Sequence, residues 1–315
     1  MSRTDELRMM FRVAHLYHEC QLKQADISQQ LHMSQAKVSR LLKRAEVEGV
    51  VRVSINVPRG TYPQLEDGLR QQYGLNEAII AECYEDRDEP ILSAIGSAAA
   101  HYIETTLGER EVIGVSSWST SLLRTVDAIR PSKHLKAERV VQIVGGIGNP
   151  SVQTHATQMV TRLAALTGAE PQLLPARGVV SSPAAQKVMV GDTYVRAALD
   201  QFKRLTIALV GIGALRPSAI FANSGSAFSD EEIDGAARSG AVGESSLRFF
   251  DSEGKPVRGP LDDRVIGITL DELKSVRRVI GVAGGQQKVE AIRACMKGKL
   301  INVLVTDRFT AEKLL

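Results

Sequence analysis

The apolar positions of the first fifty residues keep helical spacing in three consecutive stretches. These positions are Leu7, Met10, Phe11, Ala14 and Tyr17 in the first stretch, Ile27 and Leu31 in the second, and Val38, Leu41, Leu42 and Ala45 in the third. Spacings of three and four residues predict three helices, and we expect the first to pack its stripe against the other two. Ser34 can accept a hydrogen bond from the unpaired N–H groups that open the third helix, which predicts a tight turn before it.

The third predicted helix is polar and basic on the face opposite its apolar stripe. A helix is narrow enough to enter the DNA major groove, where Arg and Gln can contact base edges and Lys or Ser can hold phosphates. Most basic faces are simply solvated surface, and this face alone leaves that alternative open. The predicted DNA-binding residues are Gln35, Lys37, Ser39, Arg40, Lys43 and Arg44.

A strand pattern follows the third helix directly. The apolar residues Val51, Val53, Ile55 and Val57 alternate with Arg52, Ser54 and Asn56. Alternation with a period of two predicts a strand. Two helices and then a strand are typical of a winged helix-turn-helix, so we predict a DNA-binding domain of this kind over residues 1–58.

A linking helix is predicted between this domain and the rest of the chain. A Pro-Arg-Gly sequence ends the strand, and Leu65, Leu69 and Tyr73 then recur every four residues up to Gly74. Because glycine commonly ends helices, we assign a linker helix within residues 59–75. Its apolar stripe can dock on its own domain, as lone stripes more often do, or pair with another subunit, and we favour the second.

From residue 77 onward, short apolar runs alternate with amphipathic segments. The predicted strands are 78–81, 112–115, 140–144, 205–210, 279–282 and 302–305, and the predicted helices are 90–106, 154–167, 192–202, 231–239 and 289–297. Apolar strands between helices indicate a largely parallel sheet covered on both faces, so we predict an α/β domain over residues 76–315. Asp192 and Asp307 are interpreted as caps.

Glycine and hydroxyl residues follow four of the predicted strands. These loops are Ser-Ser-Trp-Ser-Thr at 116–120, Gly-Gly-Ile-Gly-Asn at 145–149, Gly-Ile-Gly at 211–213 and Ala-Gly-Gly-Gln-Gln-Lys at 283–288. Ligands of open α/β sheets bind beyond the carboxyl ends of strands, and glycine N–H groups, hydroxyls and helix N-termini favour anions. Together the loops predict a phosphate site, although glycine at a strand end is by itself ordinary turn chemistry.

The loops do not complete a nucleotide-binding motif. Gly211 and Gly213 are followed by Arg216 where the dinucleotide fingerprint requires a third glycine, and no stretch fits the P-loop pattern. Nucleotide ligands are therefore disfavoured.

The length of the chain indicates more than one domain, and its charge is unevenly distributed between them. A chain of 315 residues is too long for one ordinary core. The net charge is only +3, but residues 1–60 hold ten Lys and Arg against six Asp and Glu, a net of +4, whereas the remaining 255 residues hold 29 against 30, a net of −1. Positive charge is thus concentrated in the predicted DNA-binding domain, as contact with DNA requires.

Neither a membrane span nor an export signal is visible. No apolar run approaches the roughly 18 residues of a span, and the N-terminal sequence MSRTDELRMMFR is charged, so we expect a cytoplasmic protein. Cys20, Cys83 and Cys295 are far apart and odd in number, which argues against a disulfide framework and against a thiolate zinc cluster. We expect no cofactor and no metal.

Residues 24–57 and later segments resemble the SorC/DeoR-type family of bacterial sugar-responsive transcription regulators, in which a TQxxIAxxLxxSxxxVSRLLxxAxxxGxV stretch precedes a sugar-binding domain. The matching residues are Gln24, Ile27, Leu31, Ser34, Val38, Ser39, Arg40, Leu41, Leu42, Ala45, Gly49 and Val51, and residues 260–306 match the family's closing segment. Ser28 replaces the usual alanine. His32 stands where glycine is usual, so we expect it to adopt a left-handed conformation at some cost.

The resemblance implies an effector domain similar to phosphosugar isomerases and deaminases, which binds a sugar or sugar phosphate without turning it over. The family's phosphate positions match Ser116, Ser119, Thr120 and Lys288, and Glu244 matches a carboxylate that holds sugar hydroxyls. A further polar contact matches either Gln153 or Thr154. Ser119 departs from the family's usual glycine or threonine, so the effector can differ. With the loop glycines, the predicted effector-binding residues are Gly114, Ser116, Ser119, Thr120, Gly145, Gly146, Gln153, Thr154, Glu244, Gly284, Gly285 and Lys288.

Several of these residues have a purely structural alternative. Trp118, beside Ser119, can as readily be a core aromatic. Taken alone, Lys288 would more often begin a solvated helix, and Glu244 would more often be a salt-bridged carboxylate. Their joint occurrence beside glycine loops favours a binding site.

The resemblance implies three partners and no membrane: double-stranded operator DNA, a small sugar or sugar-phosphate effector, and further copies of the chain in a dimer or tetramer. We predict a ligand-controlled DNA-binding regulator that is not an enzyme and has no catalytic residues. A phosphosugar isomerase or deaminase would leave residues 24–57 unexplained, and a DNA-binding protein without an effector would leave the α/β domain unexplained.

Overall fold

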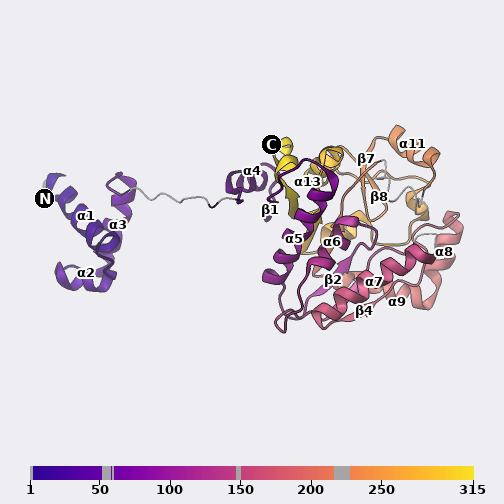
Figure 1. Ribbon diagram of the computed structural model, residues 1–315, viewed down its shortest axis with the longest axis horizontal. Coiled ribbons are helices and arrows are strands. Elements are labelled where there is room, and N and C mark those ends of the chain that lie inside the picture. The colour runs from indigo at the N-terminus through magenta and orange to yellow at the C-terminus, as the bar shows by residue number, and fades with distance from the viewer. Residues whose placement is uncertain (1–2, 52–57, 59, 147–149, 216–227) are drawn as a thin grey trace. The chain divides into compact units, whose positions relative to one another are not determined.

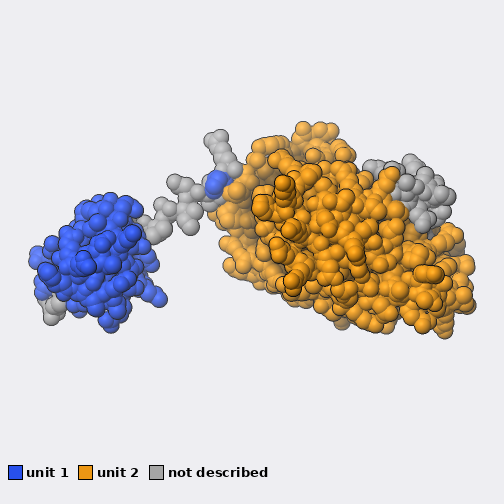
Figure 2. All heavy atoms as spheres, turned by 90° about the horizontal axis from the view of Figure 1, so that it is seen from below, with its two compact units in different colours: residues 1–58 blue, residues 59–315 orange. Residues whose placement is uncertain are grey.

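The computed structural model of this chain describes residues 3–51, 58, 60–146, 150–215 and 228–315, with the backbone alone over 150–156. Contacts between residues divide it into two compact units, residues 1–58 and 59–315 (Figure 2). Each unit has its own buried apolar core. Among the described residues, no helix is both long enough and apolar enough to cross a lipid bilayer.

The first unit contains three helices, α1 (Arg3–His18), α2 (Gln24–Gln30) and α3 (Gln35–Val47) (Figure 1). They confirm the three helices predicted from apolar spacing. The core that they enclose consists of Met10, Val13, Ala14, Ile27, Val38, Leu41, Leu42 and Ala45. The expected stripe of α1 is only partly right, because Leu7, Phe11 and Tyr17 remain exposed. Residues 52–57 of the predicted wing lie outside the described residues.

The predicted linking helix is α4 (Pro63–Tyr73), and it packs within the second unit. Leu69 and Tyr73 are buried there, and the Tyr73 hydroxyl donates to the carbonyl of Leu314 at 2.7 Å. Gly74 ends the helix with φ +63°, as predicted. The prediction that this stripe pairs with another subunit is wrong, because the core of its own unit already covers it.

A seven-stranded sheet forms the centre of the second unit, in the order β1-β10-β9-β5-β2-β3-β4. Every pairing in it is parallel. Its strands are β1 (Glu77–Ala81), β2 (Val112–Val115), β3 (Arg139–Gln142), β4 (Glu170–Gln172), β5 (Ile207–Gly211), β9 (Arg278–Val282) and β10 (Val303–Asp307). All six predicted strands are present, while the short β4 was not predicted.

Helices cover both faces of this sheet, as near-continuous apolar strands require (Figure 1). One face packs against α5 (Asp88–Thr106), α6 (Thr120–Ala128) and α7 (Pro150–Thr167). The other packs against α4, α9 (Thr193–Asp200), α12 (Leu270–Ser275), α13 (Val289–Lys297) and α14 (Arg308–Leu314). The helix α8 (Pro183–Gly191) precedes α9. Side chains alternate between the two faces, so that Val112 joins one core and Ile113 the other.

A smaller antiparallel sheet was not predicted. It consists of β6 (Gly213–Ala214), β7 (Ala241–Ser245) and β8 (Arg248–Asp251), and α11 (Asp230–Arg238) shares its apolar cluster. Short 3-10 turns at Gln201–Arg204, Asp262–Arg264 and Gln286–Lys288 complete the described elements.

Strand order reverses between β2 and β5. From β2 the chain continues to β3 and β4 on one side, and from β5 it continues to β9 and β10 on the other. Open α/β sheets bind their ligands beyond the carboxyl ends of the strands at such a switch point. Two of the predicted loops, 116–120 and 211–213, follow these two strands.

Candidate functional site

The first unit turns the predicted basic face of α3 toward solvent. Because Val38, Leu41, Leu42 and Ala45 are buried in its core, the opposite face of α3 must lie outward. Ser34 caps the helix by accepting the Lys37 N–H at 3.3 Å, which confirms the predicted helix start. The six predicted DNA-binding residues are all exposed: Gln35, Lys37, Ser39, Arg40, Lys43 and Arg44.

The basic residues of this face differ in whether an acidic side chain of the protein already pairs with them. Among the described residues, Lys37, Arg40 and Lys43 form no ion pair, and Arg40 uses only its Nε, on the Ala36 carbonyl at 3.3 Å. Cations of this kind can replace counterions at DNA phosphates. Arg44 instead pairs with Glu48 at 2.7 Å and with Glu6 at 3.3 Å, and these hydrogen bonds raise its pKa. Arg44 thus ties α3 to α1, and its predicted DNA contact would have to displace two carboxylates.

The turn between α2 and α3 is left-handed at His32, where φ is +49°. This confirms the conformation expected of a histidine that stands in a glycine position. The Ser28 hydroxyl donates to the Met33 carbonyl at 2.5 Å and holds the same turn from the α2 side. Local hydrogen bonds in the turn, as well as the apolar core, therefore hold α2 and α3 together.

In the second unit, Ser119 connects the two strands of the switch point. Its Oγ accepts the Leu122 N–H at 3.3 Å and its carbonyl accepts the Leu123 N–H at 3.0 Å, so Ser119 caps α6. Ser119 also packs on Gly211 at the end of β5, where an added Cβ would lie only 2.7 Å from the Ser119 Cβ. A glycine at 211 is what allows these strand ends to approach each other.

The first turn of α6, beside the ends of β2 and β5, has backbone N–H groups that remain available as hydrogen-bond donors. Among the described residues, no acceptor takes the N–H of Thr120 or of Ser121, the first two residues of the helix. The Ser117 hydroxyl, in the same loop, is buried and has no hydrogen-bond partner within the described part of the chain. Ser116 beside it is also buried. Unpaired N–H groups at a helix N-terminus, with its partial positive charge, favour an anion.

Trp118 joins this loop to its neighbour. Its ring packs on the main core, which confirms part of the structural alternative, and its Nε1 donates to the Gly145 carbonyl at 2.9 Å. The loops after β2 and β3 are thus brought together, as the sequence predicted. Their contact is made by an indole and a carbonyl, not by glycine N–H groups.

Three predicted glycine donors are in fact engaged inside the protein. The Gly145 N–H donates to the Ile266 carbonyl at 3.0 Å, and the Gly146 N–H donates to the Ala176 carbonyl at 2.8 Å. The Gly285 N–H donates to the Asp307 carboxylate at 3.2 Å and to the Thr310 hydroxyl at 2.8 Å. The expectation that these N–H groups are free for an anion is therefore wrong.

The remaining two glycines allow close packing. Gly114 lies inside β2, where an added Cβ would be 2.7 Å from the Ile143 side chain. At Gly284 an added Cβ would overlap the Asp307 carboxylate. Asp307 also caps α14 by accepting the Thr310 N–H at 3.0 Å, as predicted, and Asp192 caps α9. Asp307 therefore orders the 283–288 loop, a role that its sequence position did not reveal.

Glu244 and Lys288 lie near these loops and attract each other electrostatically. Glu244 lies on β7, accepts the Leu247 N–H at 3.0 Å and stands against Gly213, and Lys288 directly precedes α13. Both side chains are only partly exposed. Desolvation raises the pKa of Glu244 and lowers the pKa of Lys288, while their mutual attraction opposes both shifts. Charged groups placed in this way are poised for a polar ligand.

The other predicted polar contacts, Gln153 and Thr154, fall outside the described side chains. They belong to the first turns of α7. Residues 147–149, which end the predicted glycine loop, lie outside them as well.

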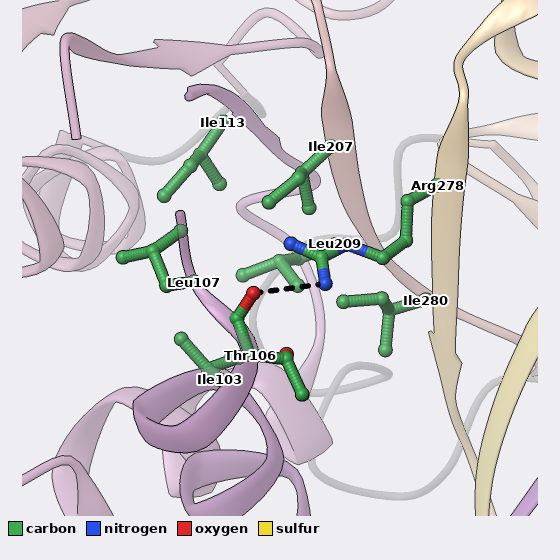
Figure 3. Close-up of a pocket in the computed structure, with 8 residues that line it drawn as sticks. All are labelled: Ile103, Thr106, Leu107, Ile113, Ile207, Leu209, Arg278 and Ile280. Atoms are coloured by element: carbon green, nitrogen blue, oxygen red, sulfur yellow. Dashed lines mark hydrogen bonds between the residues drawn. The ribbon is translucent and has the colours of Figure 1, made fainter. Parts of the chain in front are cut away.

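A separate cavity lies at the opposite end of the sheet, beside the amino end of β9 (Figure 3). It is lined by Ile103, Thr106, Leu107, Ile113, Ile207, Leu209, Arg278 and Ile280. Arg278 closes it by donating to the Thr106 carbonyl at 3.2 Å. With a volume of about 10 Å³ it has room for about one water and is too small for a sugar.

Residues 60–315 match the protein family described as "Putative sugar-binding domain". The chain is 30% identical to the deoxyribonucleoside regulator of Bacillus subtilis (strain 168) over 98% of each chain. It is also 30% identical to the sorbitol operon regulator of Klebsiella pneumoniae over the full length of both.

Solved structures give the same relationship. The crystal structure of the full-length sorbitol operon regulator SorC from Klebsiella pneumoniae superposes with a TM-score of 0.73 and 30% identity, covering 98% of this chain and 99% of that one. The structure described as "Putative sugar-binding domain of transcriptional regulator DeoR from Pseudomonas syringae pv. tomato" has a TM-score of 0.65 and 37% identity, covering 82% of this chain and all of that one. With a helix-turn-helix unit before an α/β unit of this family, the chain belongs to the SorC/DeoR family of transcriptional regulators with a sugar-binding domain.

Proposed function

We propose that this protein is a DNA-binding transcriptional regulator whose affinity for its operator is controlled by a sugar or a phosphorylated sugar or polyol. The observation that carries the proposal is the combination of an exposed basic face on α3 with a sugar-binding family match over residues 60–315. The protein acts in the cytoplasm, where bacterial operators are accessible.

DNA recognition is assigned to α3. With its apolar face fixed in the core, the helix offers Gln35, Ser39 and Arg40 to base edges, while Lys37 and Lys43 are suited to phosphates. The exposed positive side chains supply the salt-dependent part of the affinity. Two such units on two half-sites require a homo-oligomer, and we assign a dimer or a tetramer.

Effector binding is assigned to the switch point of the large sheet. The unpaired N–H groups at the start of α6, together with the hydroxyls of Ser116, Ser119 and Thr120, favour a phosphate. Lys288 supplies a compact positive charge, and Glu244 supplies an acceptor for sugar hydroxyls. A phosphorylated sugar has both of these features in one molecule.

Regulation is assigned to linkage between the two units. An effector that prefers one arrangement of the subunits changes the spacing of paired α3 helices and hence the affinity for two half-sites. A coupling free energy of about 1 to 3 kcal/mol changes DNA affinity roughly 5- to 150-fold.

A ligand screen tests the effector assignment. The full chain would be titrated calorimetrically with a panel of sugar and polyol phosphates and their unphosphorylated parents, and each mixture would be assayed for products. Binding of a phosphorylated compound without turnover is expected. Formation of an isomerised or deaminated product would show an enzyme instead.

The Lys288→Ala variant locates the site. It should weaken binding of the compound found in the screen at least tenfold while leaving operator binding without effector unchanged. Lys297→Ala is the matched control, because Lys297 lies at the exposed end of α13 and pairs with Glu253. Equal effector affinity of the Lys288→Ala and wild-type chains would show that the site lies elsewhere.

A further inference from the structure

The turn between β7 and β8 has an unfavourable backbone conformation. Ser245 pairs with Arg248 across the hairpin, which leaves Ser246 and Leu247 as a two-residue turn. Their φ angles are +56° and +63°, a combination that favours asparagine and glycine. Other residues adopt such angles at a cost, so contacts around the turn have to hold it in place.

One set of contacts fixes this turn to the switch point of the large sheet. The Ser245 hydroxyl donates to the Gly211 carbonyl at 3.0 Å, at the end of β5. Ser119, which caps α6, packs on the same glycine. Glu244, directly before Ser245, stands against Gly213. The turn therefore lies beside the residues assigned to the phosphate and to the sugar hydroxyls.

A second set of contacts fixes the other side of the turn. Leu247 packs on Gly178, where an added Cβ would be 3.1 Å from the leucine side chain. The Gly178 N–H donates to the Gly146 carbonyl at 2.6 Å, in the loop that follows β3. Ser246 therefore lies between the loops that follow β3 and β5.

Ser246 itself carries an unsatisfied polar group. The residue is 4% exposed, and its hydroxyl has no hydrogen-bond partner within the described part of the chain. An unpaired buried hydroxyl costs free energy, and the left-handed backbone adds to that cost. A group retained at such a cost calls for an explanation, and a ligand that completes the hydrogen bond provides one.

We propose that Ser246 contacts the effector, and that its hydroxyl hydrogen-bonds a sugar hydroxyl next to those held by Glu244. The inference rests on the proposed function and deepens it by adding a residue of the β7–β8 turn to the site. A serine hydroxyl is uncharged and both donates and accepts, as a sugar hydroxyl does. It changes direction by rotation about one bond between staggered positions, so the effector recruits it without moving the turn.

Melting of three single variants of the full chain without sugar tests whether the hydroxyl is unpaired. Ser246→Ala should keep or raise the melting temperature, because it removes a buried hydroxyl that has no partner. Ser245→Ala should lower it, because that hydroxyl is paired with Gly211. Ser252→Ala, at an exposed serine after β8, is the matched control and should leave it unchanged. A lower melting temperature in Ser246→Ala would reveal a partner for this hydroxyl in the free protein and overturn the proposal.

Calorimetric titration of the Ser246→Ala and Ser252→Ala chains supplies the second readout. The probes are the monophosphates of ribose, glucose, fructose and sorbitol. Ser246→Ala should weaken binding of the tightest of these probes roughly two- to twelvefold, the loss expected for one hydrogen bond, while Ser252→Ala binds like the wild type.

The two ways in which this inference can fail are distinguishable. Equal affinity of the Ser246→Ala and wild-type chains for a probe that binds would overturn the role of Ser246 and leave the proposed function standing. If none of the probes binds the wild-type chain, the assigned effector class fails and the contact of Ser246 fails with it.

Discussion

Glu244 both stabilises the turn that follows it and lies near Lys288. Its carboxylate accepts the Leu247 N–H in a turn where Ser246 and Leu247 have φ of +56° and +63°. Non-glycine residues in this region carry a strain of about 1 kcal/mol or more each. Glu244 therefore stabilises a strained turn while also lying near Lys288, so its substitution affects stability as well as any ligand.

Glu244→Gln should change how stability depends on pH. Burial raises the pKa of Glu244, so the folded state favours the protonated acid. The stability that this group contributes is fully present below its unfolded pKa and is lost as the pH rises through the folded value. The melting temperature of the variant minus that of the wild type should therefore increase as the pH rises above the ordinary value of 4.5.

Thermal melts at a series of pH values provide the measurement for Glu244→Gln. The same substitution at exposed Glu290 on α13 controls for the exchange of carboxylate for amide. A difference in melting temperature that falls or stays constant over this range would contradict the assigned environment of Glu244.

Arg40→Ala should weaken DNA binding without affecting effector affinity. Arg40 is exposed on α3 and has no acidic partner among the described residues. Loss of a bidentate base contact costs about 1 to 3 kcal/mol, and loss of a phosphate contact lowers the salt dependence by about one unit of slope. Anisotropy titrations with duplexes selected from a random library would measure both quantities.

Arg12→Ala is the matched control for Arg40→Ala, because Arg12 is an exposed arginine of α1 in the same unit. Unchanged DNA affinity and salt slope in Arg40→Ala would remove α3 from the interface with DNA.

Single residues show why some site predictions succeeded and others did not. Ser34, Asp192 and Asp307 were recognised as caps because a cap depends on local sequence alone. The N–H of Gly285 was expected to be free, but Asp307 and Thr310, more than twenty residues away, accept it. Local spacing carries no information on such a distant partner.

Elements were predictable where their hydrophobic pattern was strong. The apolar strands of the parallel sheet and the amphipathic helices α1 to α5 follow from periodicity. The hairpin of β7 and β8 was missed because its turn residues, Ser246 and Leu247, lack the Asn-Gly type of signal for positive φ. The helix α6 was not predicted at all, because the Ser-Trp-Ser-Thr sequence before it was interpreted as a loop and conceals the cap at Ser119.

Gly211→Ala tests the contact between the two switch-point strands. An added Cβ would overlap Ser119, which caps α6, so the helix start has to move. Overpacking of this kind costs about 1 to 3 kcal/mol. We expect a lower melting temperature and weaker effector binding, measured by thermal shift and calorimetry.

Gly191→Ala is the control for Gly211→Ala, because an added Cβ at Gly191 meets nothing within 4 Å and its φ is negative or extended. Wild-type stability together with wild-type effector affinity in Gly211→Ala would show that the approach of Ser119 to β5 does not shape the site.

The whole molecule consists of two units, each with its own apolar core. The order of a helix-turn-helix unit before an α/β unit was predictable from pattern and from family resemblance. The packing of α4 within the second unit was not, because an apolar stripe does not reveal which surface covers it.

The central claim is that a bound sugar or sugar phosphate changes the affinity of the protein for DNA. Fluorescence anisotropy of the full chain on a selected duplex, with and without a saturating amount of the compound found in the ligand screen, measures this directly. The account predicts a shift of roughly 5- to 150-fold in DNA affinity. Identical binding curves, under conditions where calorimetry shows the compound bound, would contradict it.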